Sequence, residues 1–199
     1  MSRSFDSWNP GLLVGLAIVG LFIAMAMFPG LFSSQDPAGL RLEHRLSPPS
    51  AANWFGTDGV GVDVYSRVVH GARTTLATIV IVLGIAILVG VGLGSVSGYL
   101  GGWIDGLLMR VADVFLAFPP LILALATNAV LGRGLQQTMF AVAFLWWPAY
   151  ARLVRSQVLA VRKLEFVESA RAIGATELRI VSRHVLPNVI DPVIVRASL

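Results

Sequence analysis

Residues 75–96 read "TLATIVIVLGIAILVGVGLGSV", and no side chain in this stretch carries a charge. A helix that crosses the hydrocarbon core of a membrane needs roughly 20 mostly apolar residues, because a thickness of ~30 Å is covered at ~1.5 Å per residue. The strands of a membrane barrel would alternate between apolar and polar residues, and this stretch does not alternate. It therefore predicts a membrane-spanning helix.

Three further uncharged runs extend this prediction to the rest of the chain: Ser7–Gln35, Val114–Gly132 and Gly134–Ala151. With 56% hydrophobic and 13% charged residues and a mean hydropathy of +0.77, the composition excludes an ordinary soluble domain. We predict an all-α, polytopic transmembrane helical bundle of about four complete spans, with a fifth beginning after Pro187. The four spans are expected at 11–32, 75–96, 111–130 and 135–150.

The N-terminus has some features of a signal peptide. Arg3 precedes an apolar run, and "AMA" at 24–26 has the form of a cleavage site. Asp6, however, interrupts the positive region that such a peptide has, and the apolar run continues to Phe32. We therefore expect an uncleaved first span.

The distribution of basic residues predicts the topology. Seven of the fifteen lysines and arginines lie within residues 152–183. Because positive charge accumulates in cytoplasmic loops, this segment and the N-terminus are predicted to lie inside, as is the turn at 98–105, and the loop at 33–73 outside. The net charge of +4 does not indicate a nucleic-acid partner, since no basic stretch is interleaved with stacking aromatics.

The sequence lacks the groups that a catalytic or metal site would need. There is no cysteine, so disulfides and thiolate metal sites are excluded. His44, His70 and His184 lie outside the predicted spans, and the spans lack the mid-membrane charges of a secondary transporter and the paired acids of an intramembrane enzyme. The sequence "GVGLG" at 90–94 lacks the spacing of a phosphate-binding loop and indicates close helix packing instead. No cofactor is predicted.

Three local patterns predict interruptions between or within the spans. "FPP" at 118–120 is expected to kink the third span, because proline removes a backbone hydrogen bond. "GYLGGWID" at 98–105 predicts a tight turn. Residues Val60–Val69 mix valines with charged residues in a pattern that suits a short amphipathic helix at the surface.

The stretch "EFVESARAIGATELRIVSRHVLPN", residues 165–188, is charged in a chain that otherwise resembles a lipid-embedded protein. Helical spacing places Phe166, Ala170 and Ile173 on one face of a first helix. Gly174 is well placed to end that helix as the residue that follows its C-cap. The sequence therefore predicts a helix that stops at a glycine turn.

A second helix is expected after this turn. Thr176 can cap it, Leu178, Val181 and Val185 form its apolar stripe, and Pro187 is expected to break it. Apolar faces on both sides of a glycine turn need a partner surface, which is either lipid headgroups or another protein.

The motif in this segment resembles a known family. "ESARAIG" at 168–174, nine further residues and "HVLP" at 184–187 resemble the loop that marks membrane permease subunits of binding-protein-dependent ABC importers. Glu168, Ala170, Gly174, Leu186 and Pro187 match the family pattern, whereas Ser169 replaces an alanine and His184 stands where isoleucine is usual.

Three longer stretches resemble the dipeptide, oligopeptide and nickel branch of this family, in particular its second permease subunit. They are "WFGTDGVGVDVYSRVVHGAR" (54–73), "GYLGGWIDGLLMRVADVFLAFP" (98–119) and the stretch from Trp146 to Ala175. In the first of them, Val62 stands where family members usually have arginine.

The resemblance implies a type I ABC importer permease, with an N-terminal span and external loop at 1–73 and a core at 74–199 that carries a cytoplasmic coupling loop at 152–187. It implies import of di- or oligopeptides across the inner membrane, with separate ATP-binding subunits, a second homologous permease and an extracytoplasmic solute-binding protein as partners. Coupling to the ATPase is expected from Glu168, Ser169, Ala170, Gly174, Ala175, Leu186 and Pro187.

Several alternatives stay open at this point. Nickel or another small solute could replace the peptide, since both occur in the branch. Family members normally continue through two more spans, so a fragment or a non-functional truncated permease is also considered. A secondary transporter is the remote alternative. ATP hydrolysis is not expected of this chain, because it has no phosphate-loop lysine motif.

Overall fold

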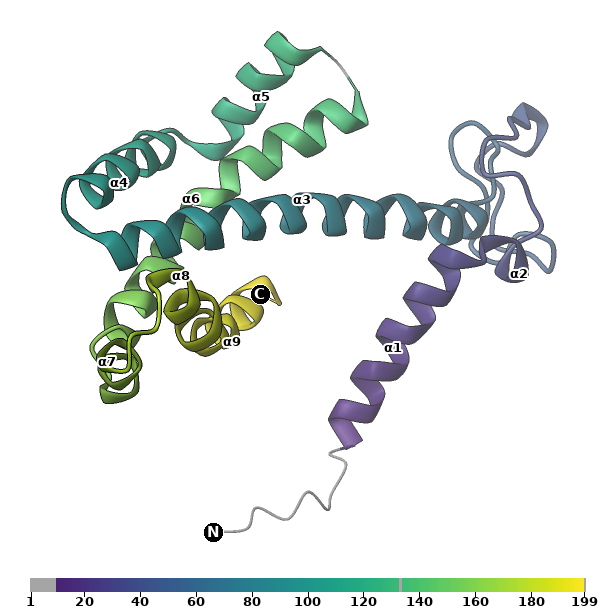
Figure 1. The fold of residues 1–199 in the computed structure, drawn as a ribbon. Coiled ribbons are helices and arrows are strands. Elements are labelled where there is room, and N and C mark those ends of the chain that lie inside the picture. Colours follow the sequence, from purple (N-terminus) through teal and green to yellow (C-terminus); the bar gives the residue numbers. More distant parts are fainter. Residues whose placement is uncertain (1–9, 133, 199) are drawn as a thin grey trace. The chain divides into compact units, whose positions relative to one another are not determined.

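A computed structural model describes residues 10–132 and 134–198, and they are mostly helical (Figure 1). No strand forms among these residues, where Thr57 and Asp63 make an isolated antiparallel bridge. The predicted all-α fold is therefore confirmed. The chain divides into two compact units, of which unit 1 ends at Thr78 and unit 2 begins at Ile79. Arg3 and Asp6, which entered the prediction of an uncleaved first span, lie outside the described residues.

Unit 1 begins with helix α1, Pro10–Met27, followed by the four-residue helix α2, Pro29–Phe32. The first span was expected to be one helix to Phe32, and this is wrong at Phe28, whose φ of −131° and ψ of 57° are not helical. The following Pro29 explains the break, because a proline ring disfavours the helical conformation of the residue before it.

The loop after α2 contains the 3-10 helix Leu42–His44 and is ordered by its own polar contacts. The backbone amides of Val60 and Val62 each donate to Asp58 Oδ1 at 2.9 Å. These two hydrogen bonds, with the Arg67 guanidinium beside the carboxyl, hold the pKa of Asp58 below its usual value. Val62 itself is buried.

Helix α3, Val64–Leu100, is longer than expected. The short separate helix predicted at Val60–Val69 is wrong, because the helix that begins at Val64 continues without a break through residue 75. Asp63 caps it, since its Oδ2 accepts a hydrogen bond from the Ser66 amide at 2.7 Å. No proline lies between Asp63 and Leu100 to end the helix earlier.

In unit 2, α3 is followed by α4 (Gly102–Ala117), α5 (Pro120–Leu131) and α6 (Leu135–Val161). The turn expected at 98–105 is narrower than predicted and centres on Gly101, whose φ is +68°. The predicted third span is divided between α4 and α5, which meet at an angle of 93°. Two consecutive prolines cause this bend, and Phe118 before them is extended, with φ −90° and ψ 139°.

Among the described residues, two helices, α1 and α3, are long and apolar enough to cross a membrane, or three spans exist if the bent α4–α5 pair counts as one. The predicted fourth span, 135–150, lies in α6, which is not among the helices that are long and apolar enough to cross a membrane. Gln136, Gln137 and Pro148 lower the hydropathy of its first part, and Arg152 and Arg155 charge its second.

Helix α3 packs closely on α6 through Gly90, Gly94 and Gly98, which recur every four residues. A Cβ on Gly94 would lie 2.5 Å from the carbonyl oxygen of Ala151, and one on Gly90 would lie 2.5 Å from Tyr150 Cβ. The prediction that these glycines permit close helix packing is confirmed.

The chain ends in four short helical elements, namely α7 (Glu165–Ala172), α8 (Glu177–Ile180), the π-helix Val181–Val185 and α9 (Leu186–Ala197). The expectation that Pro187 breaks the second helix is wrong. Pro187 lies in the first turn of α9, where a missing N–H is tolerated. The π-helix shifts the backbone hydrogen bonds, so that the Leu186 amide donates to Val181 O, and the helical path continues.

Candidate functional site

Residues 165–187, here called the 165–187 segment, contain a glycine turn that has the geometry predicted from the sequence. Gly174 has a φ of +83°, which favours glycine. Its amide donates to Arg171 O at 3.0 Å, and the Ala175 amide donates to Ala170 O at 3.1 Å. These two bonds make the Schellman motif, which satisfies the last carbonyls of α7 and fixes the direction of the chain after it.

Thr176 caps α8 as predicted. Its backbone is extended, with φ −68° and ψ 149°, and its hydroxyl oxygen accepts a hydrogen bond from the Arg179 amide at 3.4 Å. Three residues after the turn, the chain is therefore helical again. The turn is defined on both sides by local hydrogen bonds.

The inner face of the 165–187 segment belongs to the hydrophobic core of unit 2. Val167, Ala170, Ile180 and Val185 are buried there. They form one cluster with residues of α3, α6 and α9, among them Ala86, Tyr150, Val154, Val158, Val161, Val189 and Val193. The segment is therefore fixed on α6 and is not a mobile loop between two spans.

The outer face of the segment differs from the predicted apolar stripes. Of Phe166, Ala170 and Ile173, only Ala170 is buried, and Val167 takes the inner position instead. Ile173 is 86% exposed and Leu178 is 80% exposed, one on each side of Gly174. Apolar side chains with this exposure leave a surface that water solvates poorly.

The residues that match the family motif divide between these two faces. Ala175 and Leu186 are partly buried and pack against the same core cluster as Ala170. Glu168, Ser169, Gly174 and Pro187 are exposed. Glu168 forms no ion pair with any residue that the structure describes.

The sequence did not predict two polar connections near the segment. The Tyr99 hydroxyl, at the end of α3, donates to Glu177 Oε2 and accepts from Arg171 Nη2, the latter at 3.2 Å. Arg162 Nη1 donates to the carbonyl oxygens of Gly98 and Tyr99 at 3.0 and 3.1 Å. No local spacing could reveal contacts between residues more than 60 positions apart in the chain.

A partly buried polar cluster joins three helices of unit 2. Arg155 of α6 binds both carboxylate oxygens of Asp105 of α4, with Nε at 2.5 Å from Oδ1 and Nη2 at 2.6 Å from Oδ2. The hydroxyl of Ser97, in α3, also donates to Asp105. A two-pronged arginine–carboxylate pair fixes orientation as well as distance.

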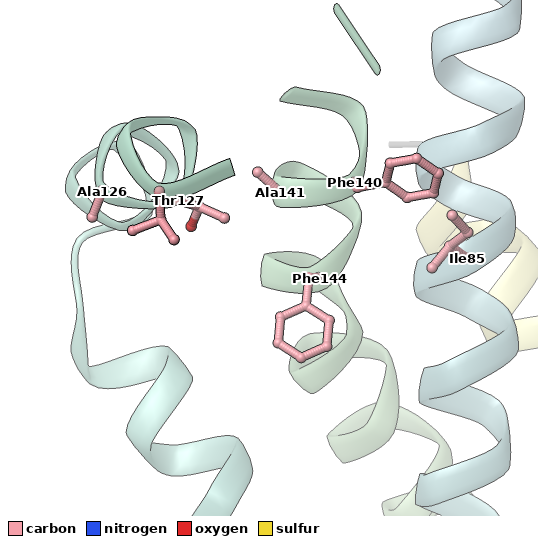
Figure 2. Close-up of a pocket in the computed structure, with 7 residues that line it drawn as sticks. Ile85, Ala126, Thr127, Phe140, Ala141 and Phe144 are labelled. Atoms are coloured by element: carbon pink, nitrogen blue, oxygen red, sulfur yellow. The ribbon is translucent and has the colours of Figure 1, made fainter. Parts of the chain in front are cut away.

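Figure 2 shows an apolar pocket of unit 2 that lies between α3, α5 and α6. Its wall is formed by Ile85, Ala126, Thr127, Val130, Phe140, Ala141 and Phe144. Apart from the Thr127 hydroxyl, which donates to Leu123 O, these side chains have no polar group. In residues 10–132 and 134–198 there is no group of three or more His, Cys, Asp or Glu residues that could hold a metal ion.

The fold and the site together define a helical membrane protein that presents a rigid, partly apolar turn next to its spans. Residues 90–199 match the family described as "Binding-protein-dependent transport system inner membrane component". The chain belongs to this family, and the resemblance inferred from the 165–187 segment is confirmed.

Curated relatives agree with this assignment. The chain is 43% identical over 187 residues to the dipeptide transport system permease protein DppC of Alkalihalophilus pseudofirmus, covering 94% of this chain and 62% of the relative. It is 40% identical over 191 residues to the probable D,D-dipeptide transport system permease protein DdpC of Escherichia coli K12, covering 96% and 64%. It is 36% identical over 198 residues to the glutathione transport system permease protein GsiD of Pectobacterium atrosepticum, covering 99% and 65%. The chain thus spans less than two thirds of the length of these relatives.

Proposed function

We propose that this chain is a permease subunit of an ATP-driven importer that moves di- or oligopeptides across the cytoplasmic membrane. The observation that carries the proposal is the Gly174 turn, which is fixed on α6 from within and exposes Ile173 and Leu178 on its outer side. A rigid support with an apolar outer face suits a surface that must receive a partner and transmit its movement. Family membership supports this use of the segment.

The partner that we propose for this surface is a separate ATP-binding subunit. Ile173 and Leu178 would be buried in the contact, and the exposed carboxylate of Glu168 could pair with a cation of the partner. Ser169, Gly174 and Pro187 complete the exposed part of this contact, while Ala170, Ala175 and Leu186 hold the segment on α6. ATP hydrolysis then takes place on the partner, and this chain supplies the mechanical connection.

The substrate class that we propose is a short peptide. The relatives are named for the transport of dipeptides, D,D-dipeptides and glutathione. A second homologous permease would complete the pathway across the membrane, and an extracytoplasmic binding protein would deliver the solute to it.

Uptake assays test this proposal. The chain should be expressed with its ATP-binding subunits, second permease and binding protein in a strain without peptide importers, and labelled dipeptide and Ni²⁺ should be offered separately. We expect dipeptide uptake that disappears without the ATP-binding subunits. Uptake of Ni²⁺ alone would overturn the substrate class, and uptake without the ATP-binding subunits would indicate a secondary transporter.

The proposed topology places the N-terminus and residues 152–187 in the cytoplasm and the 33–73 loop outside. Ser50 and Ser156 are both exposed and lie on opposite sides in this arrangement. Because the chain has no cysteine, Ser50→Cys and Ser156→Cys variants each carry a single thiol. We expect a membrane-impermeant maleimide to label intact cells through Ser50→Cys only, and both variants after permeabilisation. Labelling of Ser156→Cys alone in intact cells would contradict the topology.

A further inference from the structure

The polar contacts of Tyr99 join the end of α3 to both sides of the Gly174 turn. Arg171 lies in the last turn of α7 and Glu177 in the first turn of α8. Their side chains face each other, with Arg171 Nε 3.4 Å from Glu177 Oε1. The Tyr99 hydroxyl bonds to both of them. The turn is thereby closed by a group that belongs to a different helix.

The ion pair alone would be a weak connection. The side chains of Arg171 and Glu177 are 51% and 60% exposed, and exposed ion pairs are screened by water. Hydrogen bonds from a neutral hydroxyl to charged groups are stronger than those between neutral groups. Tyr99 is itself half-buried. Its two hydrogen bonds therefore give the connection between α3 and the turn its direction.

The end of α3 to which Tyr99 belongs is in turn firmly held. Arg162, which follows the last residue of α6, donates to the carbonyl oxygens of Gly98 and Tyr99. These are among the last carbonyls of α3, which have no partner within their own helix. Gly98 also packs against α6, where an added Cβ would lie 2.9 Å from Val158 Cβ. A displacement of Tyr99 must therefore move the end of α3.

We propose that Tyr99, Arg171 and Glu177 form a polar link that transmits movement of the Gly174 turn to α3, with Tyr99 as a positioning residue for coupling. This inference rests on the proposed function, in which an ATP-binding subunit moves the turn. The link shares no residue with the docking surface, although Leu178 lines one pocket together with Tyr99 and Glu177. Loss of the link should leave binding of the ATP-binding subunits intact and lower the amount of dipeptide imported per ATP hydrolysed.

The test is Tyr99→Phe in the complete transporter, reconstituted in liposomes with its ATP-binding subunits, second permease and binding protein. Two quantities should be measured, namely co-purification of the ATP-binding subunits and dipeptide imported per ATP hydrolysed. We expect co-purification within ~2-fold of the wild type and a ~10-fold lower import per ATP, the size of effect that loss of hydrogen bonds to charged groups produces. Tyr65→Phe is the matched control, because the ring of Tyr65 packs on Trp54 and Phe55 in unit 1.

An exchange of charges supplies an independent test. Arg171→Glu alone places two carboxylates beside Tyr99 and should lower import per ATP by ~10-fold, as loss of a charge-assisted contact does. Arg171→Glu combined with Glu177→Arg restores the ion pair and should recover most of the loss, since interacting residues are non-additive. If Arg171 contacted the ATP-binding subunit directly, the exchange would fail to restore coupling.

The outcomes separate this inference from the proposed function. If the wild-type chain neither retains the ATP-binding subunits nor imports dipeptide, the proposed function fails and the link with it. If the wild type does both, and Tyr99→Phe lowers protein yield or subunit retention but leaves import per ATP unchanged, Tyr99 is merely structural. In that case the link is overturned and the proposed function remains.

Discussion

Gly94→Ala is expected to destabilise the protein by ~1–3 kcal/mol, the usual range for forcing extra volume into a packed interior. The added Cβ would lie 2.5 Å from the carbonyl oxygen of Ala151 and 2.9 Å from Val154 Cβ. The first of these neighbours is backbone, which cannot rotate away as a side chain can. Helices α3 and α6 must therefore separate, and the core around Val154 loses contacts with them.

Gly92→Ala is the matched control in the same helix. Apart from its chain neighbours and the nearby backbone of α3, no described atom lies within 4 Å of a Cβ at Gly92. Alanine also favours a helix over glycine by ~1 kcal/mol. We expect this variant to be as stable as the wild type or slightly more stable. Thermal unfolding of the purified protein in detergent measures both changes, and equal unfolding temperatures for the two variants would show that α3 and α6 do not pack as described.

Gly174→Val is expected to reduce ATP-binding subunit retention and solute uptake by ~10-fold or more, with little change in the amount of protein in the membrane. The Gly174 φ of +83° costs an L-residue ~1–2 kcal/mol, and more when its side chain is β-branched. Apart from the two chain neighbours, a Cβ at this position meets no described atom within 4 Å, so the effect arises from backbone strain and not from collision with another element. The strain should tilt α8 relative to α7.

Gly174→Asn separates backbone strain from simple loss of glycine. Asparagine adopts the left-handed conformation more readily than other residues and sometimes takes this position at helix ends. Gly174→Asn should therefore keep most of the ATP-binding subunit retention and solute uptake that Gly174→Val loses. If both variants kept normal retention and uptake, a merely topological role for the segment would be favoured. If both lost them equally, the left-handed conformation of Gly174 would not be the property that coupling needs.

The parts of the fold that the sequence predicts correctly depend on neighbours along the chain. Gly174 and Thr176 end and begin helices through bonds to residues within five positions. The packing role of the glycines in α3 follows from their spacing. Such features were predictable because turn and cap preferences are properties of short segments.

Several of the errors concern features that the local sequence pattern does not determine. Val167, and not Phe166, lies on the inner face of α7 because α6 determines which side of this two-turn helix is covered. The continuation through Pro187 depends on a π-helix that hydrophobic periodicity does not reveal. The size of the bend at Phe118 also escaped prediction, since consecutive prolines predict a break but not its angle.

The candidate site was predicted only in part, because some of its residues are brought together by the packing of helices that are distant in the sequence. The family motif located Glu168 and Gly174, but Tyr99 belongs to α3, and only the packing of α3 and α6 brings it to the turn. The sequence predicted apolar faces beside the turn, but helical periodicity does not distinguish an apolar residue that faces the core from one that is exposed to a partner. The exposure of Ile173 and Leu178 supplied this distinction.

The central claim is that the outer face of the Gly174 turn contacts an ATP-binding subunit, and thiol cross-linking in membranes tests it most directly. Ile173→Cys places the only thiol of the chain on the outer face, where the native side chain is 86% exposed, and Val167→Cys places it on the inner face, where the native side chain is 0% exposed. With a short thiol-to-amine cross-linker and the assembled transporter, we predict a product with the ATP-binding subunit from Ile173→Cys and none from Val167→Cys. A transporter that imports solute normally but gives no product from Ile173→Cys, or equal product from both variants, would contradict the account.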